Sequence, residues 1–279
     1  MNKLKTIKKL ITKPKLKTQT LKPTFIEILI LIYRFRYLTR NQIQTLLNHK
    51  TFNRIIIWLN QLTDKKYLKK YDDKKDPTKP NIYSLGTEGR KYFLENKDSE
   101  NQELKNIQLH LLDRVWKEHS YSIPFRNHCL FLVDIYISLL SLVKINNAIL
   151  KFHSKTDLTG MQYLIREEPD AFFSITEKNG LSKRYFLDIF DPYPKYKYLL
   201  KRVKQYSYYY LKNYWQDNNK SSFPEIIFVC YDYKTKNNLN KIIQKELENQ
   251  EELIFYLTIW GEVRNQGMTR QTLHKVEME

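Results

Sequence analysis

The chain has 279 residues, 42% of them hydrophobic and 28% charged, which is enough for two modest domains and excludes a fully disordered or membrane-embedded protein. Its 48 Lys and Arg exceed its 30 Asp and Glu and give a net charge of +18. This excess favours a polyanionic partner, nucleic acid first and an acidic membrane second. An AT-rich coding sequence, which enriches Lys, Asn, Ile and Tyr, is the compositional alternative.

Other features of the sequence argue against export and membrane insertion. The two cysteines, Cys129 and Cys230, offer neither a disulfide framework nor the spacing of zinc ligands. The apolar runs 25–33 and 130–143 are too short to cross a bilayer. The N-terminus lacks the apolar stretch of a secretory signal. We therefore expect a cytoplasmic protein without a membrane partner.

Residues 1–23 are strongly basic. They include eight lysines and no acid, and Pro14 and Pro23 interrupt any helix. We expect a basic flexible arm that follows phosphates or enters a minor groove. The alternative is a solvated tail without defined contacts.

Residues 24–96 follow the order helix, helix, helix, hairpin, helix. Apolar residues recur at helical spacing from Ile28 to Phe35, and Thr39 stands where an N-cap would begin a short second helix. The remaining elements are expected as a helix over 51–63, strands over 67–71 and 81–85, and a helix over 86–94. This order predicts a winged helix-turn-helix domain.

The third helix of this domain is expected to enter a DNA major groove, whose width admits a helix. Its outer face offers Asn53 for adenine and Arg54 for guanine, with Thr51 near its start. Lysines suited to phosphates crowd the wing: they are Lys65, Lys66, Lys69, Lys70, Lys74, Lys75 and Lys79. Because winged helices also bind proteins, a protein-binding module is the alternative, which the lysines disfavour.

Residues 106–265 follow a polar linker over residues 95–105 and read first as helical, then as strands alternating with helices. This pattern predicts a mixed-sheet αβ domain, and an α+β class for the whole chain. Residues 266–279 are expected to be a tail. Strands are expected over 148–152, 170–175, 184–190, 225–230 and 254–260, and helices over 195–214 and 235–249.

Two carboxylates stand out in neighbouring predicted strands. Asp170 opens one strand and Asp188 lies within the next, so a hairpin would bring them together. Two converging carboxylates provide the hard oxygen ligands of Mg²⁺, which activates water and stabilises a phosphodiester transition state. As a purely structural residue, Asp188 would need a cationic partner such as Arg184 or Lys201.

Pro169-Asp170 and Asp188 resemble the Pro-Asp and second acid of the PD-(D/E)XK nuclease fold, whose element order is helix, strands, helix, strand. The resemblance implies a metal-dependent nuclease site. The Lys of that motif would fall at position 190, where this chain has Phe190. A cation from the following helix, Lys201 or Arg202, would have to take its place.

The chain also resembles the replication-relaxation family, whose members are found on plasmids and mobile elements. In that family a basic residue precedes a Tyr at the spacing that Arg202 has to Tyr206, and an acid-bearing helix corresponds to the one with Asp134. The resemblance covers residues 24 to about 260. It is carried by residues 37–43, 58–62, 67–68, 82–90, 118–119, 132–136, 186–189 and 223–229.

We therefore expect a DNA-binding protein of plasmid replication or mobilisation that docks on an origin-like duplex. In the catalytic interpretation, Asp134, Asp170 and Asp188 hold Mg²⁺, and Arg202 or Lys201 steadies the scissile phosphate while one strand is nicked. In the alternative, a degenerate nuclease fold serves a non-catalytic regulator or mobilisation accessory factor. Replication or mobilisation proteins and a second copy of the chain are further candidate partners.

Overall fold

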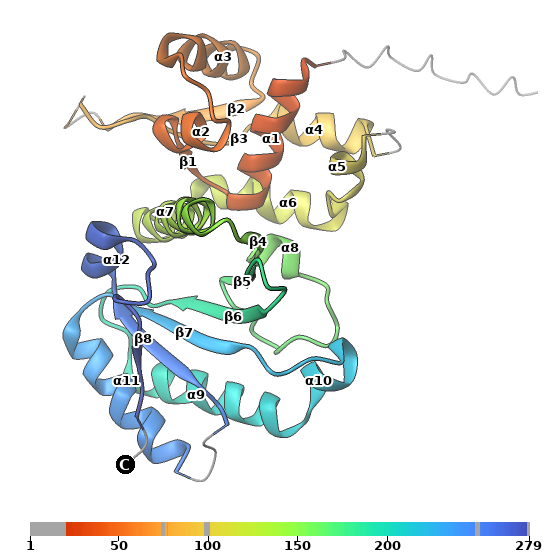
Figure 1. Cartoon of the computed structure of the whole chain (residues 1–279). Coiled ribbons are helices and arrows are strands. Elements are labelled where there is room, and N and C mark those ends of the chain that lie inside the picture. Colours follow the sequence, from red (N-terminus) through yellow and green to blue (C-terminus); the bar gives the residue numbers. More distant parts are fainter. Residues whose placement is uncertain (1–20, 74–75, 77, 98–100, 249–251, 278–279) are drawn as a thin grey trace, which may run out of the picture.

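The computed structural model describes residues 21–73, 76, 78–97, 101–248 and 252–277 (Figure 1). Most of the expected basic arm, with all of its lysines except Lys22, lies outside the described residues. Lys74 and Lys75 of the expected wing also lie outside them.

The N-terminal half has the element order expected from the sequence. Its helices are α1 (Pro23–Phe35), α2 (Arg40–Leu46), α3 (Phe52–Asp64) and α4 (Thr87–Glu95), and its hairpin consists of β2 (Leu68–Tyr71) and β3 (Ile82–Leu85). A short strand that the sequence did not predict, β1 (Leu38–Thr39), pairs with β3. The sheet order is β1-β3-β2, with antiparallel neighbours. This arrangement is a winged helix-turn-helix, so the predicted fold of this half is confirmed.

Local sequence signals explain where the helices of this half begin and which face they bury. The Thr39 hydroxyl accepts a hydrogen bond from the Gln42 backbone N–H at 3.1 Å, and the Gln42 side chain accepts one from the Thr39 N–H at 2.9 Å. This capping box starts α2. In α3, Ile55, Leu59 and Leu62 are fully buried at helical spacing, so the opposite face of the helix remains outside the core.

Two glycines let α4 pack closely against the base of the hairpin. A Cβ at Gly89 would lie 2.5 Å from the Tyr67 carbonyl oxygen and 2.8 Å from Leu85 Cδ1. A Cβ at Gly86 would overlap the backbone carbonyl of Lys66. The Tyr-x-Leu-x-x-x-Gly pattern that ends at Gly89 therefore has a packing reason, because only glycine allows this approach.

The C-terminal half contains a six-stranded sheet of order β4-β5-β6-β7-β8-β9. Its strands are β4 (Ile149–Ser154), β5 (Ala171–Thr176), β6 (Ser182–Ile189), β7 (Glu225–Cys230), β8 (Phe255–Ile259) and β9 (His274–Lys275). The pairs β4–β5, β5–β6 and β8–β9 are antiparallel, and β6–β7 and β7–β8 are parallel. The expected hairpin is therefore present, with Ala171 opposite Leu187. The mixed sheet confirms the α+β class.

Helices cover both faces of this sheet, with α7 above and α9 and α11 below in the view of Figure 1. The helices of this half are α5 (Gln102–Lys105), α6 (Leu109–Lys117), a 3-10 turn (Glu118–Ser120), α7 (Ile123–Asn146), α8 (Lys155–Leu158), α9 (Tyr196–Leu211), α10 (Tyr214–Asn219), α11 (Tyr233–Glu246) and α12 (Trp260–Gln266). Apart from the short helices α8 and α10, the order α7-β4-β5-β6-α9-β7 follows the helix, strands, helix, strand order that the nuclease resemblance implied.

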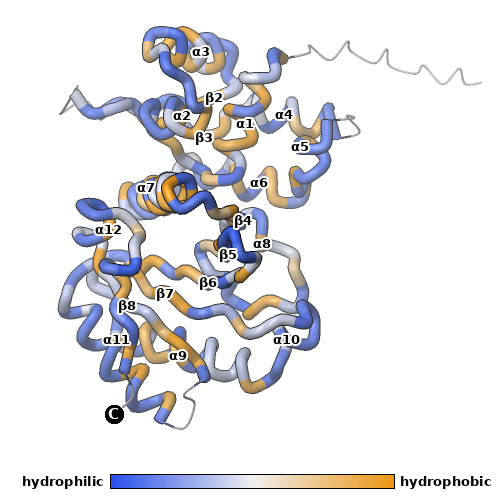
Figure 2. Tube along the Cα trace, viewed as in Figure 1, coloured by the Kyte–Doolittle hydropathy of each residue, from blue (hydrophilic) through white to orange (hydrophobic). Residues whose placement is uncertain are grey.

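Successive side chains of β6 pack against helices on opposite faces of the sheet. Leu187 and Ile189 belong to the cluster that contains buried residues of α7, whereas Phe186 and Phe190 belong to the cluster of α9 and α11. Strand β7 is covered on both faces and is hydrophobic along most of its length (Figure 2).

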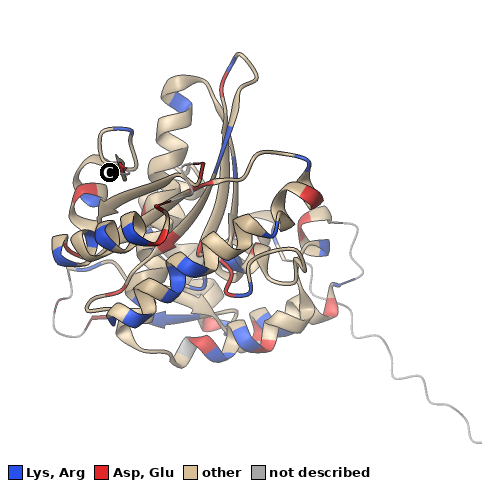
Figure 3. Cartoon of the chain, turned by 90° about the horizontal axis from the view of Figure 1, so that it is seen from below, with Lys and Arg blue, Asp and Glu red and all other residues tan. Residues whose placement is uncertain are grey.

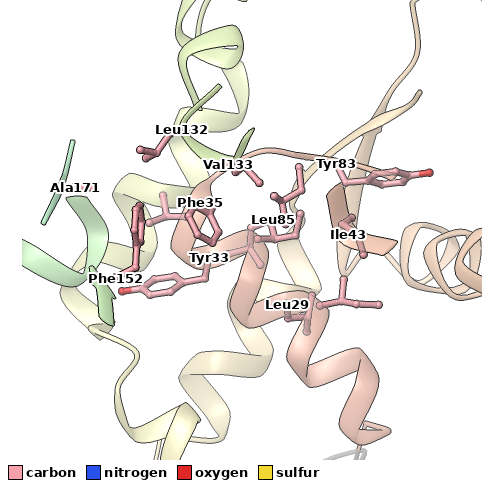
Figure 4. Packing of buried hydrophobic residues seen from close by; sticks show 14 of the residues in the cluster. Leu29, Tyr33, Phe35, Ile43, Tyr83, Leu85, Leu132, Val133, Phe152 and Ala171 are labelled. Carbon is pink, nitrogen blue, oxygen red and sulfur yellow. The ribbon is translucent and has the colours of Figure 1, made fainter. Parts of the chain in front are cut away.

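The two expected domains share one core. Leu104, inside the expected linker, and Leu112 of α6 belong to the same buried cluster as Ile28 of the winged helix. Figure 4 shows Tyr33 and Phe35 of α1 beside Phe152 of β4. The polar composition of residues 95–105 therefore does not mark a break in the packing.

Residues 266–279 were expected to be a tail, but most of them belong to the fold. Strand β9 pairs with β8, and Met268, Thr272 and Val276 are buried. The Met268 N–H also donates to the Ser138 hydroxyl of α7 at 2.7 Å. The sequence missed this strand because it is only two residues long.

Helix α7 spans 24 residues and extends well beyond the apolar run 130–143. The run by itself is too short to cross a bilayer. Within the described residues α7 is the one helix that is long and apolar enough to do so by length and composition. That is weak evidence, because a buried core helix passes the same test. Val133, Ile135 and Leu139 of α7 are buried in the shared core.

Candidate functional site

The outer face of α3 carries the residues that were expected to read DNA bases. Thr51, Asn53 and Arg54 are all exposed. The Arg54 guanidinium lies 6.0 Å from the centre of the Trp58 ring on the same helix. The structure therefore brings these three predicted residues together on an open helix face.

Exposed lysines follow α3 along the chain. Lys65 and Lys66 follow the helix directly, and Lys69 and Lys70 lie on β2 with exposed side chains. Residues 52–71 include five Lys or Arg and one acid, Asp64. We call Arg54 and these four lysines the α3–wing surface. Its charge complements that of a phosphate backbone.

Lys79 differs from the other wing lysines. Its Nζ lies 3.0 Å from Asp73 Oδ2 and 3.7 Å from Asp76 Oδ2. Since two carboxylates of the same loop already offset its charge, Lys79 is less available to a phosphate than the lysines of the α3–wing surface.

Asp170 precedes β5 and lies against the first turns of α7. Its Oδ2 accepts a hydrogen bond from the Ile189 N–H at 2.8 Å and lies 3.3 Å from His128 Nε2. Its Oδ1 lies 3.9 Å from Lys155 Nζ. Burial alone would raise the pKa of Asp170, but His128 and Lys155 outweigh it and hold the pKa well below its usual range.

His128 bridges two carboxylates. Its Nδ1 lies 3.1 Å from Asp191 Oδ1, while its Nε2 faces Asp170. Burial disfavours the imidazolium, but the two carboxylates overcome this effect and raise the pKa of His128 to about 10. With both ring nitrogens protonated, His128 acts here as a cation and not as a general base.

Asp188 lies within β6, and side chains of α9 supply its hydrogen-bond partners. The Arg202 guanidinium donates to both of its oxygens, Nε to Oδ2 and Nη2 to Oδ1, each at 2.8 Å. The Tyr206 hydroxyl also donates to Oδ2 at 2.9 Å. Burial would lower the pKa of Arg202, but Asp188 more than offsets it, so the pKa of Arg202 is raised.

A cavity of about 730 Å³ joins these groups. Asp170, Asp188 and Arg202 all line it, together with His128 and Lys155. Phe190, at the position of the nuclease lysine, also lines the cavity. Its ring packs edge-on against Phe228, with centroids 5.1 Å apart. An apolar side chain therefore occupies the place where the motif requires a cation.

The sequence matches a protein-family model. The model for replication-relaxation proteins matches residues 29–226, most of the chain. The chain belongs to the replication-relaxation family. The resemblance drawn from the sequence is thereby confirmed. No curated protein sequence is a significant match to this replication-relaxation protein.

Solved structures share only limited similarity with this replication-relaxation protein. A MepR-like protein complexed with pseudoligands is 16% identical, with a TM-score of 0.28, over 46% of this chain and 80% of that one. AdcR from Streptococcus pyogenes is 18% identical, with a TM-score of 0.26, over 44% and 81%. A single-residue mutant of Lactococcus lactis ZitR is 14% identical, with a TM-score of 0.26, over 46% and 77%. The winged helix is identified by its own topology and not by these similarities.

The three carboxylates expected to bind Mg²⁺ do not form one site. Asp134 lies on another side of α7, where its Oδ1 accepts a hydrogen bond from Gln42 Nε2 at 2.6 Å. It lines a separate cavity with Gln42 and Arg264. Burial raises the pKa of Asp134, and the Gln42 hydrogen bond and Arg264 oppose that rise. The expectation that Asp134 adds a third metal carboxylate is therefore corrected: it fastens α2 to α7.

The remaining two carboxylates do not fit a metal in this arrangement either. Both oxygens of Asp188 accept hydrogen bonds from Arg202, and Asp170 Oδ2 already has His128 and the Ile189 N–H. Among the described residues, no group of three or more His, Cys, Asp or Glu could hold a metal ion. Mg²⁺ needs several free oxygen ligands or waters. The side chains present meet this need poorly.

Arg202 or Lys201 was expected to steady a phosphate, and the two side chains have different surroundings and partners. Lys201 is exposed and forms an ion pair with Glu167. Arg202 is buried and bound to Asp188. Sequence reasoning missed the role of His128, whose only signal was its place near the start of an apolar helix. No local pattern connects it to Asp170, because the contact exists only in the tertiary structure.

Proposed function

We propose that this replication-relaxation protein binds double-stranded DNA through the α3–wing surface, with α3 in the major groove of an origin-like duplex. The observation that carries the proposal is the series of exposed polar and cationic side chains that runs along the chain from α3 onto β2. Arg54 would contact a guanine edge and Asn53 an adenine edge, and Lys65, Lys66, Lys69 and Lys70 would contact phosphates. Family membership and the winged helix both support a DNA-binding, replication-related protein.

Fluorescence anisotropy with a short labelled duplex tests this proposal. If these four lysines contact phosphates, the affinity should fall by about two orders of magnitude between about 50 and 200 mM salt. The variant Lys69→Ala/Lys70→Ala should reduce the slope of log K against log salt by about 2. The matched control is Lys241→Ala/Lys245→Ala, which removes two exposed lysines from α11 and should leave the slope unchanged. An absence of duplex binding at low salt would contradict the proposal.

Base reading by α3 is tested separately from phosphate binding. Arg54→Ala should reduce discrimination at one guanine position by about 1–3 kcal/mol, while binding to unrelated duplexes weakens much less. Selection of bound fragments from a library of the plasmid or mobile element would supply the cognate duplex. Equal losses on cognate and unrelated duplexes would show that Arg54 contacts only the backbone.

The αβ half has two candidate functions, Mg²⁺-dependent nicking and a non-catalytic role in DNA binding. The geometry favours the non-catalytic role of a regulator or mobilisation accessory factor, because Arg202 and Tyr206 occupy Asp188 and Phe190 replaces the motif lysine. Incubation of supercoiled plasmid carrying the cognate origin with protein and Mg²⁺ should yield no open circles. Open circles that disappear in a folded Asp188→Ala variant would favour nicking instead.

The proposal extends to compartment and assembly. Cys129 and Cys230 are buried, free thiols, which agrees with the expected reducing cytoplasm. A homodimer would place two α3 helices on half-sites about one helical turn apart. Sedimentation of the chain with and without cognate duplex, and with candidate replication or mobilisation proteins, would test these partners.

A further inference from the structure

Five exposed tyrosines gather where two neighbouring parallel strands end. Tyr193, Tyr196 and Tyr198 follow β6 and are 85%, 56% and 49% exposed. Tyr231 and Tyr233 follow β7 and are 41% and 60% exposed. Because β6 and β7 are parallel neighbours, both loops leave the same edge of the sheet. We call these five residues the tyrosine edge.

The tyrosine edge is shaped by its backbone as well as by its composition. Tyr193 has a φ of 59°, in the left-handed region that side chains with a Cβ disfavour. Pro192 and Pro194 flank it and restrict the turn further. The Tyr193 ring lies 6.4 Å from that of Tyr231, centre to centre, so the two loops present aromatic rings next to each other.

Lysines are interleaved with these rings. Lys195 and Lys197 flank Tyr196, and Lys234 follows Tyr233; all three are exposed. None of the three forms an ion pair of 4.0 Å or less with any residue that the structure describes. Lys and Arg are also spread over the helices of this half, as the view from below shows (Figure 3).

The acids of the tyrosine edge are already engaged. Asp191 lies 3.1 Å from His128, and Asp232 caps α11 by accepting a hydrogen bond from the Thr235 N–H at 2.8 Å. Only Asp191 has a cationic partner, but the three lysines outnumber the remaining carboxylate of Asp232. The net charge of this surface is therefore positive, which complements a polyanion.

We propose that the tyrosine edge binds single-stranded DNA, with bases stacked on its rings and phosphates beside Lys195, Lys197 and Lys234. Alternating aromatic and cationic side chains suit a single strand, because its bases offer free faces for stacking. In a duplex those faces are already covered by neighbouring base pairs. The site is distinct from the α3–wing surface and does not rest on duplex binding there.

Affinity for a labelled thymidine oligonucleotide, measured by anisotropy, tests the inference. Tyr193→Ala/Tyr231→Ala should weaken binding by at least about tenfold, since each stacked base contributes severalfold or more. Tyr193→Phe/Tyr231→Phe retains the rings and should bind within about twofold of the parent. Duplex binding at the α3–wing surface should be the same in all three proteins.

A matched control variant and a crosslinking experiment distinguish binding at the tyrosine edge from a general effect of removing any exposed tyrosine. Tyr208→Ala removes a tyrosine from α9 that is 58% exposed, and it should leave oligonucleotide affinity unchanged. Photo-crosslinking of an oligonucleotide containing 5-iododeoxyuridine should label the peptides of residues 191–200 and 231–236. The inference is overturned if the alanine pair binds like the parent, if Tyr208→Ala loses as much affinity, or if the crosslinks fall elsewhere.

Discussion

At the scale of single residues, two carboxylates of the αβ half, Asp170 and Asp188, have cationic partners on different helices. Asp170 faces His128 of α7, and Asp188 faces Arg202 of α9. Breaking a buried pair by removing one partner is costly because the other charge is left without compensation. These pairs therefore tie both helices to adjacent strands of the sheet, and they can be tested as structural elements.

Replacement of Arg202 should reveal the structural role of Asp188. Arg202→Met leaves a carboxylate buried under α9 and should reduce the free energy of unfolding by about 3–5 kcal/mol. In Arg202→Met/Asp188→Asn, the neutral amide oxygen can still accept a hydrogen bond from the Tyr206 hydroxyl. The double variant should therefore recover about half or more of the lost free energy of unfolding. Urea unfolding of the parent, single and double variants measures the cycle. A neutral Arg202→Met would contradict the structural interpretation.

The His128 bridge should make stability depend on pH. Its pKa is raised to about 10 in the fold, against about 6.5 in an unfolded chain. Its contribution is therefore complete below about pH 6.5 and is lost as the pH rises towards 10. His128→Gln should cost roughly 3 kcal/mol near pH 6 and clearly less near pH 9.5.

His153 provides the control for this pH dependence. Burial lowers its pKa, so its contribution is complete above about pH 6.5 and is lost in acid. Urea unfolding of His153→Gln should therefore show no decline in its cost from neutral to alkaline pH. If His128→Gln and His153→Gln behave alike, the two-carboxylate bridge is not formed in solution.

At the scale of elements, the position of α4 depends on a close approach to the hairpin. Gly89→Ala would place a methyl group against the Tyr67 carbonyl and Leu85, and should destabilise the protein by about 1–3 kcal/mol through overpacking. Gly261→Ala in α12 meets nothing within 4 Å and should be neutral or stabilising by up to about 1 kcal/mol. Thermal or urea unfolding of both variants checks this contrast.

At the scale of the whole molecule, the winged helix is fastened to the αβ half at several points. Arg34 Nε lies 2.6 Å from Asp157 of α8, and Gln42 reaches Asp134 of α7. Tyr37 donates its hydroxyl to the Glu118 carbonyl. With one shared hydrophobic cluster beneath them, these contacts should make the described part of the chain unfold as one cooperative unit.

Hydrogen exchange of the full chain can test this cooperativity. Gly89→Ala weakens the winged helix, so in a single unit it should accelerate exchange in β7 by about the same factor as in β3. Independent halves would keep β7 as protected as in the parent. Gly261→Ala again serves as the control, with unchanged exchange in both strands.

The sequence by itself determined the winged helix, the order of most elements and the αβ alternation, because these depend on local signals. Each of these signals lies within a short stretch of neighbouring residues. Examples are the Thr39 cap, the helical spacing of Ile55, Leu59 and Leu62, and the glycines after β3. The exposed cations of α3 and β2 follow from the same periodicity. Strands as short as β1 and β9 escaped detection because they carry no periodicity of their own.

The tertiary structure alone decided which charges meet. His128 lies 42 positions before Asp170, and Gln42 is 92 positions from Asp134, so no spacing rule connects them. The sequence placed Asp170 and Asp188 on adjacent strands, but only packing paired one with a side chain of α7 and the other with a side chain of α9. Ion pairing across long loops depends on how layers stack, and that is set by burial of the whole core and not by any local segment.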